Sequence, residues 1–264
     1  MSKRSNKRGK SNGAMPKAPV QTSAERRVWV AVMRERTTSH LAADSLEKVH
    51  MVVGQLGYGK LSLPYMRTDS ARNEYVKRFM TNSTSPNDVL VMLDNDHIFD
   101  PGIVPKLVSD VTDREGERGV VGCLAFKRGE PFEPCHFIRG DDGMLHSMVY
   151  WQDGLYPGEI VGHACVAIAR WVFDVLIENG HVAPFWRYEY REEDISSPSE
   201  DMYFGRICEE SGIRHWADYR LEAPHLIMST VDRQTWRAYT NDHPELIGKT
   251  ETIVPVLMSP GGGQ

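Results

Sequence analysis

The chain has 264 residues, of which 41% are hydrophobic and 25% are charged, and its formal net charge is -5. This composition is typical of a folded globular protein that is long enough to bury a large core. No apolar stretch approaches the ~20 residues that a membrane-spanning helix needs, and the four scattered cysteines form no CxxC pair, which excludes a disulfide framework. We therefore expect a cytoplasmic protein with free thiols.

The charge is distributed unevenly along the chain. Residues 1–27 carry eight Lys or Arg and one acid, which leaves 23 basic and 35 acidic residues, a net charge of -12, in the remainder. The first segment is rich in Ser, Lys, Asn, Gly and Pro, so residues 1–27 are expected to be a disordered, solubilising tail. Residues 28–250 are expected to form one domain, and residues 251–264 a flexible end. The acidic body disfavours a nucleic-acid partner.

Apolar patterning predicts alternating strands and helices. The expected strands are 28–33, 61–66, 89–93, 119–125 and 159–169, followed by an extended segment over 213–226. The expected helices are 44–54, 70–80, one that starts near Asp100-Pro101, 170–179 and 199–211. Residues 127–158 and 184–198 show no clear pattern. The alternation predicts an α/β domain with an open, twisted, mainly parallel sheet flanked by helices.

The most informative motif is Asp94-Asn95-Asp96, directly after the apolar run 89–93. Ligands of open α/β sheets usually bind beyond the carboxyl ends of the strands. Carboxylates at that position suit Mg²⁺ or Mn²⁺ together with substrate phosphates. An ordinary acidic turn after a strand is the alternative explanation.

Five segments in this order resemble the GT-A-fold glycosyltransferases. They are Ala71-Arg72-Asn73, VLVMLDNDHIFDP at 89–101, GHACVAIAR at 162–170, SEDMYFGRICEESGI at 199–213 and APHL at 223–226. The chain is most similar to family-2-like members, including small ones encoded by bacteriophages, and the resemblance covers about residues 28–240. It implies a GT-A-like, Rossmann-related fold.

The resemblance also implies roles for the motif residues. Asp94 and Asn95 would contact the nucleotide or sugar, and Asp94 and Asp96 would hold Mn²⁺ or Mg²⁺. His225 would be a further metal ligand, although a lone histidine is more often a buried structural residue. A divalent ion would neutralise the charge of the departing diphosphate.

Glu200 and Asp201 lie at the start of the helix predicted over 199–211. Acids in a first turn are stabilised by the helix dipole, typically by ~0.3–1 kcal/mol, which explains both residues without catalysis. The resemblance instead implies that Asp201 is the base that accepts the acceptor's proton, and we assign Glu200 an orienting role.

The remaining candidates would contact donor or acceptor. Arg72, expected at a helix start, is predicted to bind phosphate, with a surface arginine as the alternative. The resemblance places Gly162 and His163 on the acceptor side. Candidate platforms for stacking a sugar are Trp151, Trp186 and Tyr188, although such scattered aromatics more often pack in a core or a loop.

Together these features predict a metal-dependent glycosyltransferase of the hexosyltransferase type. It would move a sugar from a nucleotide-sugar donor, most simply a UDP-sugar, to a hydroxyl acceptor with inversion. A nucleotidyltransferase of similar fold and a non-catalytic nucleotide-sugar-binding protein are the alternatives.

Overall fold

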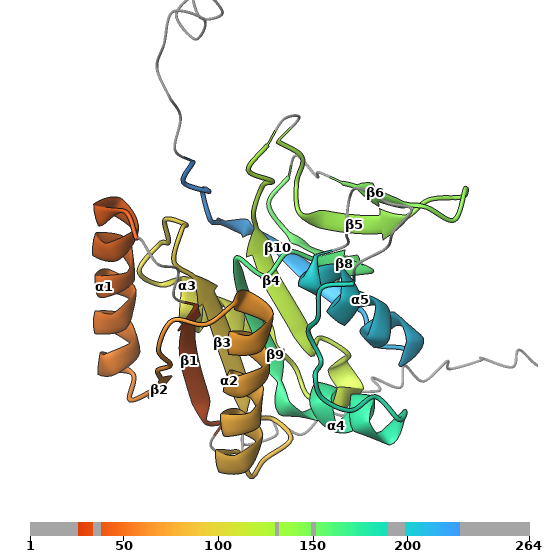
Figure 1. Ribbon diagram of the computed structural model, residues 1–264, viewed down its shortest axis with the longest axis horizontal. Coiled ribbons are helices and arrows are strands. Elements are labelled where there is room, and N and C mark those ends of the chain that lie inside the picture. Colours follow the sequence, from red (N-terminus) through yellow and green to blue (C-terminus); the bar gives the residue numbers. More distant parts are fainter. Residues whose placement is uncertain (1–25, 34–37, 130–131, 149–151, 190–198, 228–264) are drawn as a thin grey trace, which may run out of the picture.

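A computed structural model of the chain describes residues 26–33, 38–129, 132–148, 152–189 and 199–227. These ranges form a seven-stranded sheet, a three-stranded sheet and the helices that cover them (Figure 1). Among the described helices, none combines the length and apolar character that a bilayer crossing requires. Most of the predicted N-terminal tail and the whole predicted C-terminal tail lie outside the described residues.

The helices are α1 His40–Gln55, α2 Thr68–Asn82, α3 Ile103–Asp110, α4 Arg170–Glu178 and α5 Glu200–Glu210, with a 3-10 turn, η1, at Arg114–Gly116. The strands are β1 Val28–Met33, β2 Gly59–Leu61, β3 Val89–Asp94, β4 Val120–Leu124, β5 His136–Arg139, β6 Leu145–Ser147, β7 Leu155–Gly158, β8 Ile160–Val161, β9 Cys165–Ala169 and β10 His215–Glu222.

The large sheet has the strand order β2-β1-β3-β9-β4-β10-β7. Strands β2, β1, β3, β4 and β10 run in one direction, whereas β9 and β7 are antiparallel to their neighbours. The prediction of an open, mainly parallel sheet is thus confirmed for strand direction. The antiparallel β9 lies between β3 and β4, and β7 is antiparallel to β10. Half of the neighbouring strand pairs are therefore antiparallel.

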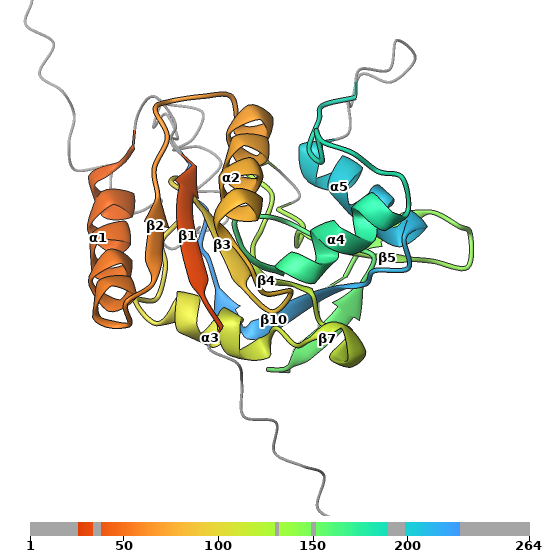
Figure 2. The same cartoon turned by 90° about the horizontal axis from the view of Figure 1, so that it is seen from below.

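Helices cover both faces of this sheet. Helix α2 packs against β1 and β3, and α4 packs against β9, whereas α3 lies across the opposite face and contacts α1. Figure 2 shows α2 and α4 on one side of the strands and α3 on the other. The smaller sheet, β6-β5-β8, is joined to the domain partly through α5, which packs on β8.

Strand β3 is the central element of the core. All five residues from Val89 to Leu93 are fully buried, as their uninterrupted apolar sequence predicts for a strand covered on both faces. Burying one such side chain typically contributes about 1.5–3 kcal/mol. The strand ends at Asp94, and the chain then turns through Asn95 and Asp96. The acidic motif is therefore held at the edge of the most buried part of the sheet.

The strand predicted over 159–169 is divided into β8 and β9. At Gly162, between the two, an added Cβ would lie only 2.5 Å from the Cβ of Cys135. The backbones approach so closely there that only glycine fits. Residues 127–158, left unassigned above, contain β5, β6 and β7. The strand predicted over 61–66 is wrong except at Leu61, because β2 lies earlier in the chain and ends there.

Helix α3 begins later than the Asp100-Pro101 pair predicts. Asp100 Oδ1 accepts a hydrogen bond from the Gly102 backbone N–H at 2.8 Å, which forms a turn before the helix. Gly102 is the N-cap, and Pro105 then falls in the first helical turn, where its missing N–H is not needed.

The N-terminal boundary of the domain lies before Val28. Arg26, assigned above to the tail, donates to the carbonyls of Val108 and Val111 at 2.9 and 3.0 Å. The backbone N–H of Arg27 donates to Asp88 Oδ1 at 3.0 Å. These two residues therefore belong to the folded domain.

Asp88 is fully buried and ties this first segment to the loop before β3. Its Oδ2 accepts hydrogen bonds from Ser83 Oγ and from the backbone N–H groups of Thr84 and Ser85, at 3.0–3.1 Å. Burial raises the pKa of Asp88, but these hydrogen bonds and that of Arg27 outweigh burial and hold the pKa below its usual value. The loop thus depends on an ionised carboxylate.

We expect Asp88→Asn to lower the free energy of unfolding by about 1–3 kcal/mol, because the amide leaves buried donors unsatisfied. Urea denaturation at pH 7 measures this, with Asp44→Asn on the exposed face of α1 as the control, expected within ~0.5 kcal/mol. A group with a lowered folded pKa stabilises above its unfolded pKa of ~3.9 and loses that contribution as the pH falls. The difference in free energy of unfolding between Asp88→Asn and wild type should therefore become smaller as the pH falls. A difference that stays constant with pH would contradict this prediction.

Candidate active site

The candidate site is built where the carboxyl ends of three parallel strands meet. Asp94–His97 follow β3, Phe126–Arg128 follow β4, and His225 follows β10. Backbone hydrogen bonds join the first and last of these segments: Ile98 N–H donates to Pro224 O at 3.0 Å, and Leu226 N–H donates to Asp96 O at 2.8 Å. The pairing fixes His225 beside Asp96, although 129 positions separate them in the sequence.

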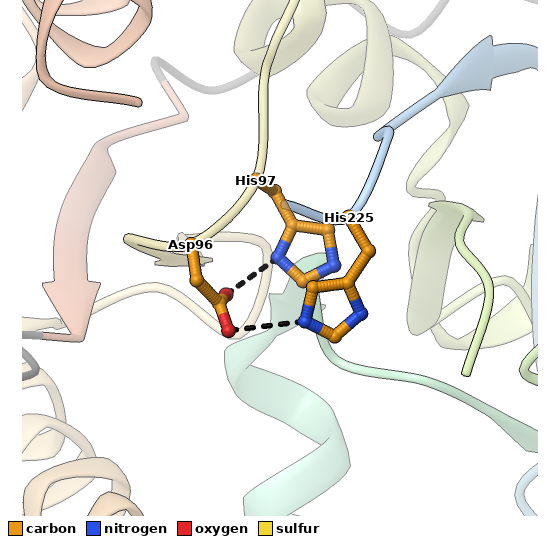
Figure 3. Close-up of side chains that lie close together, drawn as sticks. All are labelled: Asp96, His97 and His225. Carbon is orange, nitrogen blue, oxygen red and sulfur yellow. Dashed lines mark hydrogen bonds and ion pairs between the residues drawn. The ribbon is translucent and has the colours of Figure 1, made fainter. Parts of the chain in front are cut away.

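Asp96, His97 and His225 form one cluster, whose ligand atoms all lie within 4.8 Å of one another. Figure 3 shows both imidazoles directed at the same carboxylate, one at each oxygen. His97 Nδ1 lies 2.7 Å from Asp96 Oδ1, and His225 Nε2 lies 3.0 Å from Asp96 Oδ2. The two rings are stacked with centroids 4.0 Å apart.

Hydrogen bonding orients the two histidines differently. His225 Nδ1 lies 3.0 Å from the Phe126 carbonyl, to which it can only donate, and His225 Nε2 accepts from Arg128 Nε at 2.7 Å. The lone pair of His225 is thus on Nε2 and faces Asp96 Oδ2. Burial lowers the pKa of His97, so neutral His97 donates to Asp96 from Nδ1. A second hydrogen bond of this kind orients many metal ligands.

This arrangement fits a divalent cation. Asp96 Oδ2 and His225 Nε2 are two acceptor atoms 3.0 Å apart, which requires a positive group between or beside them. Neighbouring ligands of an octahedral ion lie about 3.0 Å apart when each is about 2.1 Å from the metal. Burial raises the pKa of Asp96, but the hydrogen bond from His97 and the charge of Arg128 oppose this and hold the pKa well below its usual range, so the carboxylate is ionised. An imidazole ligand favours Mn²⁺ over the harder Mg²⁺.

A second cluster surrounds Arg72, which is 1% exposed on the inner face of α2. Its guanidinium contacts Asp94 at 3.0 Å, Glu200 at 3.1 Å and Asp201, all through side-chain oxygens. Burying the Arg72 guanidinium without partners would be costly, and the three acids offset this cost. The guanidinium in turn holds the three carboxylates together. Asp94 and Asp201 remain partly exposed, at 24% and 21% of their side chains, so the cluster reaches the surface.

The three acids differ in their pKa values. Burial and the charges of Asp201 and Asp96 raise the pKa of Asp94 to about 7, against the effect of Arg72. Burial and the charge of Asp201 also raise the pKa of Glu200. Asp201 differs from these two acids. Burial raises its pKa, but Arg72 and His163 outweigh burial and hold the pKa well below the usual range. At neutral pH Asp201 is therefore the fully ionised member of the three.

His163 holds the Asp201 carboxylate in position. The backbone N–H of His163 donates to Asp201 Oδ2 at 3.1 Å, and its Nδ1 accepts from Trp186 Nε1 at 3.0 Å. Trp186 is fully buried and stacks on Phe204 at 4.2 Å, so it is a core residue and not the sugar platform suggested above. Gly162 and His163, which were predicted on the acceptor side, are also buried. Of the two, His163 positions Asp201 through its backbone N–H.

Three donor-side predictions change with the structure. Asp94 is not in the metal cluster, because the chain turns at Asn95 and the two aspartates no longer share a face. Arg72 lies in the second turn of α2 and is enclosed by acids, so it is not placed to bind phosphate. Asn95 is buried and donates to Thr38 Oγ1 at 2.5 Å, which ties the motif to the segment before α1.

The structure adds two residues that the sequence did not single out for this site, His97 and Arg128, and it places the predicted Tyr188 beside Glu200. His97 orients Asp96, and Arg128 contacts both Asp96 and His225. Tyr188, a predicted sugar platform, is 44% exposed and hydrogen-bonds Glu200, whereas the predicted Trp151 lies outside the described residues. The histidine directly after the acidic triplet was the one readable signal among them, because histidine beside carboxylates is a common metal-site pattern.

The chain was compared with known proteins. No protein-family model matches it, and no curated protein matches it. Solved structures with a likeness include A197 from STIV, with a TM-score of 0.48 and 14% identity over 77% of this chain and 86% of that one. Another is GalNAc-T7 with UDP, GalNAc and Mn²⁺, with a TM-score of 0.49 and 10% identity over 76% of this chain and 44% of that one.

A third is a glycosyltransferase involved in the glycosylation of the major capsid of PBCV-1, with a TM-score of 0.36 and 13% identity over 83% of this chain and 99% of that one. All three TM-scores lie below 0.5, so the function proposed below rests on the site itself and on the motifs that the site contains.

Proposed function

We propose that this protein is a metal-dependent GT-A-like glycosyltransferase of the hexosyltransferase type, with family-2-like motifs. It transfers a sugar from a UDP-sugar to a hydroxyl acceptor with inversion at the anomeric carbon. The four cysteines are free, which suits a cytoplasmic location, including the cytoplasm of a host cell if the chain is phage-encoded.

The observation that carries the proposal is the pairing of two unlike clusters at one sheet edge. One cluster, Asp96 with His225, has the donor set and spacing for a divalent cation. The other places partly exposed carboxylates next to it, and the charge of Asp96 contributes to the pKa of Asp94. Sugar transfer from a nucleoside diphosphate needs these two parts, a counterion for the leaving diphosphate and a base for the acceptor.

Each cluster residue then has a defined part. Asp96 and His225 hold Mn²⁺, which supplies charge neutralisation to the diphosphate, and His97 keeps the Asp96 carboxylate in position. Asp201 accepts the proton of the attacking hydroxyl while Arg72 and the His163 N–H fix its orientation. Exposed Tyr188 is the residue that an acceptor meets first, and its hydrogen bond to the buried Glu200 links it to the cluster.

Asp94 contributes to donor binding in this scheme. With its pKa near 7, Asp94 can both donate to and accept from the hydroxyls of a ribose or sugar. The buried contact of Arg72 on both of its oxygens holds that carboxylate in one orientation. Asp94 thus selects a polyhydroxylated donor beside the metal without being a metal ligand itself.

The test is incubation of the full chain with a panel of nucleotide-sugars and Mn²⁺, scored for release of nucleoside diphosphate. We expect one donor to be hydrolysed slowly without acceptor, and no release when EDTA is added. Release of pyrophosphate from a nucleoside triphosphate and a sugar phosphate would instead indicate a nucleotidyltransferase. Metal-dependent binding of a nucleotide-sugar with no turnover on any acceptor would indicate a binding protein.

A further inference from the structure

Arg128 caps the candidate metal cluster from the solvent side. Its side chain is 56% exposed, whereas those of Asp96 and His225 are 15% exposed. It projects from the segment after β4, whose backbone is fixed by hydrogen bonds of Lys127 N–H to Glu133 O and of Cys135 N–H to Ala125 O. The guanidinium is thus held over the cluster by a defined backbone, while more than half of the side chain is exposed.

The guanidinium contacts the same two atoms that a metal would need. Arg128 Nη2 forms an ion pair with Asp96 Oδ2, and Arg128 Nε donates to His225 Nε2 at 2.7 Å. An imidazole nitrogen has one lone pair in the ring plane, so Nε2 can serve the guanidinium or a metal but not both. A divalent ion on Asp96 would also repel an arginine at this distance.

We propose that Arg128 is a displaceable occupant of the cation position, and that it becomes a diphosphate ligand when the metal binds. The guanidinium stabilises the acidic and imidazole groups in the metal-free protein. A metal ion must displace it from Asp96 Oδ2 and His225 Nε2, and the exposed guanidinium can then turn to an anionic ligand beside the metal. A diphosphate is the acceptor that matches a planar, five-donor guanidinium best. The diphosphate part rests on the proposed function, whereas the competition with metal does not.

This exchange couples two ligands. Without nucleotide, loss of the Arg128 contacts with Asp96 and His225 reduces the net free energy of metal binding. With a nucleoside diphosphate present, the displaced guanidinium regains two charge-assisted hydrogen bonds, so the metal binds more tightly. By linkage the metal strengthens nucleotide binding by the same factor, and such couplings are typically about 5–150-fold.

The experiment is calorimetric titration of Mn²⁺ into the full chain, with and without saturating UDP, for wild type, Arg128→Met and Arg128→Lys. Met keeps most of the side chain's length and removes the guanidinium. We expect Arg128→Met to bind Mn²⁺ alone about tenfold more tightly than wild type, and UDP to improve its Mn²⁺ affinity about tenfold less. Lys keeps the charge without the fork and should lie between the two.

Lys127→Met is the matched control, because Lys127 is the adjacent exposed cation and pairs with Glu133 instead of the cluster. It separates competition at the site from the general field of a positive charge. Equal tightening by Lys127→Met and Arg128→Met would overturn the proposal. So would unchanged or weaker Mn²⁺ binding by a folded Arg128→Met protein.

The outcome is distinguishable from failure of the proposed function. If Arg128→Met tightens Mn²⁺ binding but no nucleotide-sugar is turned over, the displacement stands and the glycosyltransferase assignment falls. If UDP leaves the Mn²⁺ affinity of wild type unchanged, the diphosphate role of Arg128 is wrong.

Discussion

Mn²⁺ affinity is expected to fall by at least ~100-fold in Asp96→Asn and in His225→Ala, together with almost all transfer activity. Each substitution removes one of the two atoms that face each other at 3.0 Å. Removing a group that only hydrogen-bonds a metal ligand already costs roughly 10–100-fold in metal affinity or activity. His97→Phe should fall in that smaller range, because it keeps the ring stacked on His225 and loses only the hydrogen bond to Asp96.

Calorimetry with Mn²⁺ and then with UDP measures these losses, and Asp94→Asn is the informative control. Asp94 contacts Arg72 and lies outside the metal cluster, so its substitution should change Mn²⁺ affinity only a few fold. A loss as large as that of Asp96→Asn would restore Asp94 as a ligand and contradict the separation of the two clusters. Mn²⁺ affinity that is equal in wild type and Asp96→Asn would remove the metal site altogether.

Asp201→Asn is expected to reduce kcat by ~10²–10⁴-fold, the usual cost of losing general-base action. The donor should still bind with nearly unchanged affinity, because the metal cluster and Asp94 are untouched. An amide oxygen can still accept from the backbone N–H of His163, but it cannot accept the acceptor's proton at neutral pH. Steady-state kinetics with saturating donor, paired with UDP calorimetry, separates these two effects.

The Asp201→Asn variant should fold, because Arg72 keeps Asp94 and Glu200 as partners and the cluster loses one of its repelling charges. Circular dichroism and the melting temperature check this. Glu200→Gln is the comparison from the same helical turn, and it should alter the KM for the acceptor more than kcat. Near-wild-type turnover by folded Asp201→Asn would reduce Asp201 to a structural acid and point to a retaining mechanism.

The parts of this site that depend on local sequence could be predicted. The uninterrupted apolar run 89–93 identified a doubly covered strand, and the end of that strand placed the acidic motif at the sheet edge. The helix predicted over 199–211 is α5, Glu200–Glu210, which carries Asp201 in its first turn. The family resemblance also pointed to His225, which the structure places on Asp96.

The parts that depend on pairings across the chain could not be predicted. Nothing near Arg72 in the sequence shows that three distant acids enclose it, and a lone arginine near a helix start looks like a phosphate ligand. The different directions of Asp94 and Asp96 arise from a turn that the spacing alone does not reveal. Arg128 lies in a segment without periodicity, and only the assembled sheet brings it over the cluster.

The backbone pairing that brings His225 to Asp96 means that the cluster forms only when the sheet is completely folded. Its two ligand atoms come from residues that follow β3 and β10, which are far apart in the sequence, so an unfolded chain has no preformed site. A ligand that binds only the folded state raises its apparent stability by RT ln(1 + [L]/Kd), about 2.7 kcal/mol at a hundredfold excess over Kd. The ion would thus act as a removable clamp between the early and late parts of the chain, and scarcity of metal would expose the protein to unfolding as well as to loss of activity.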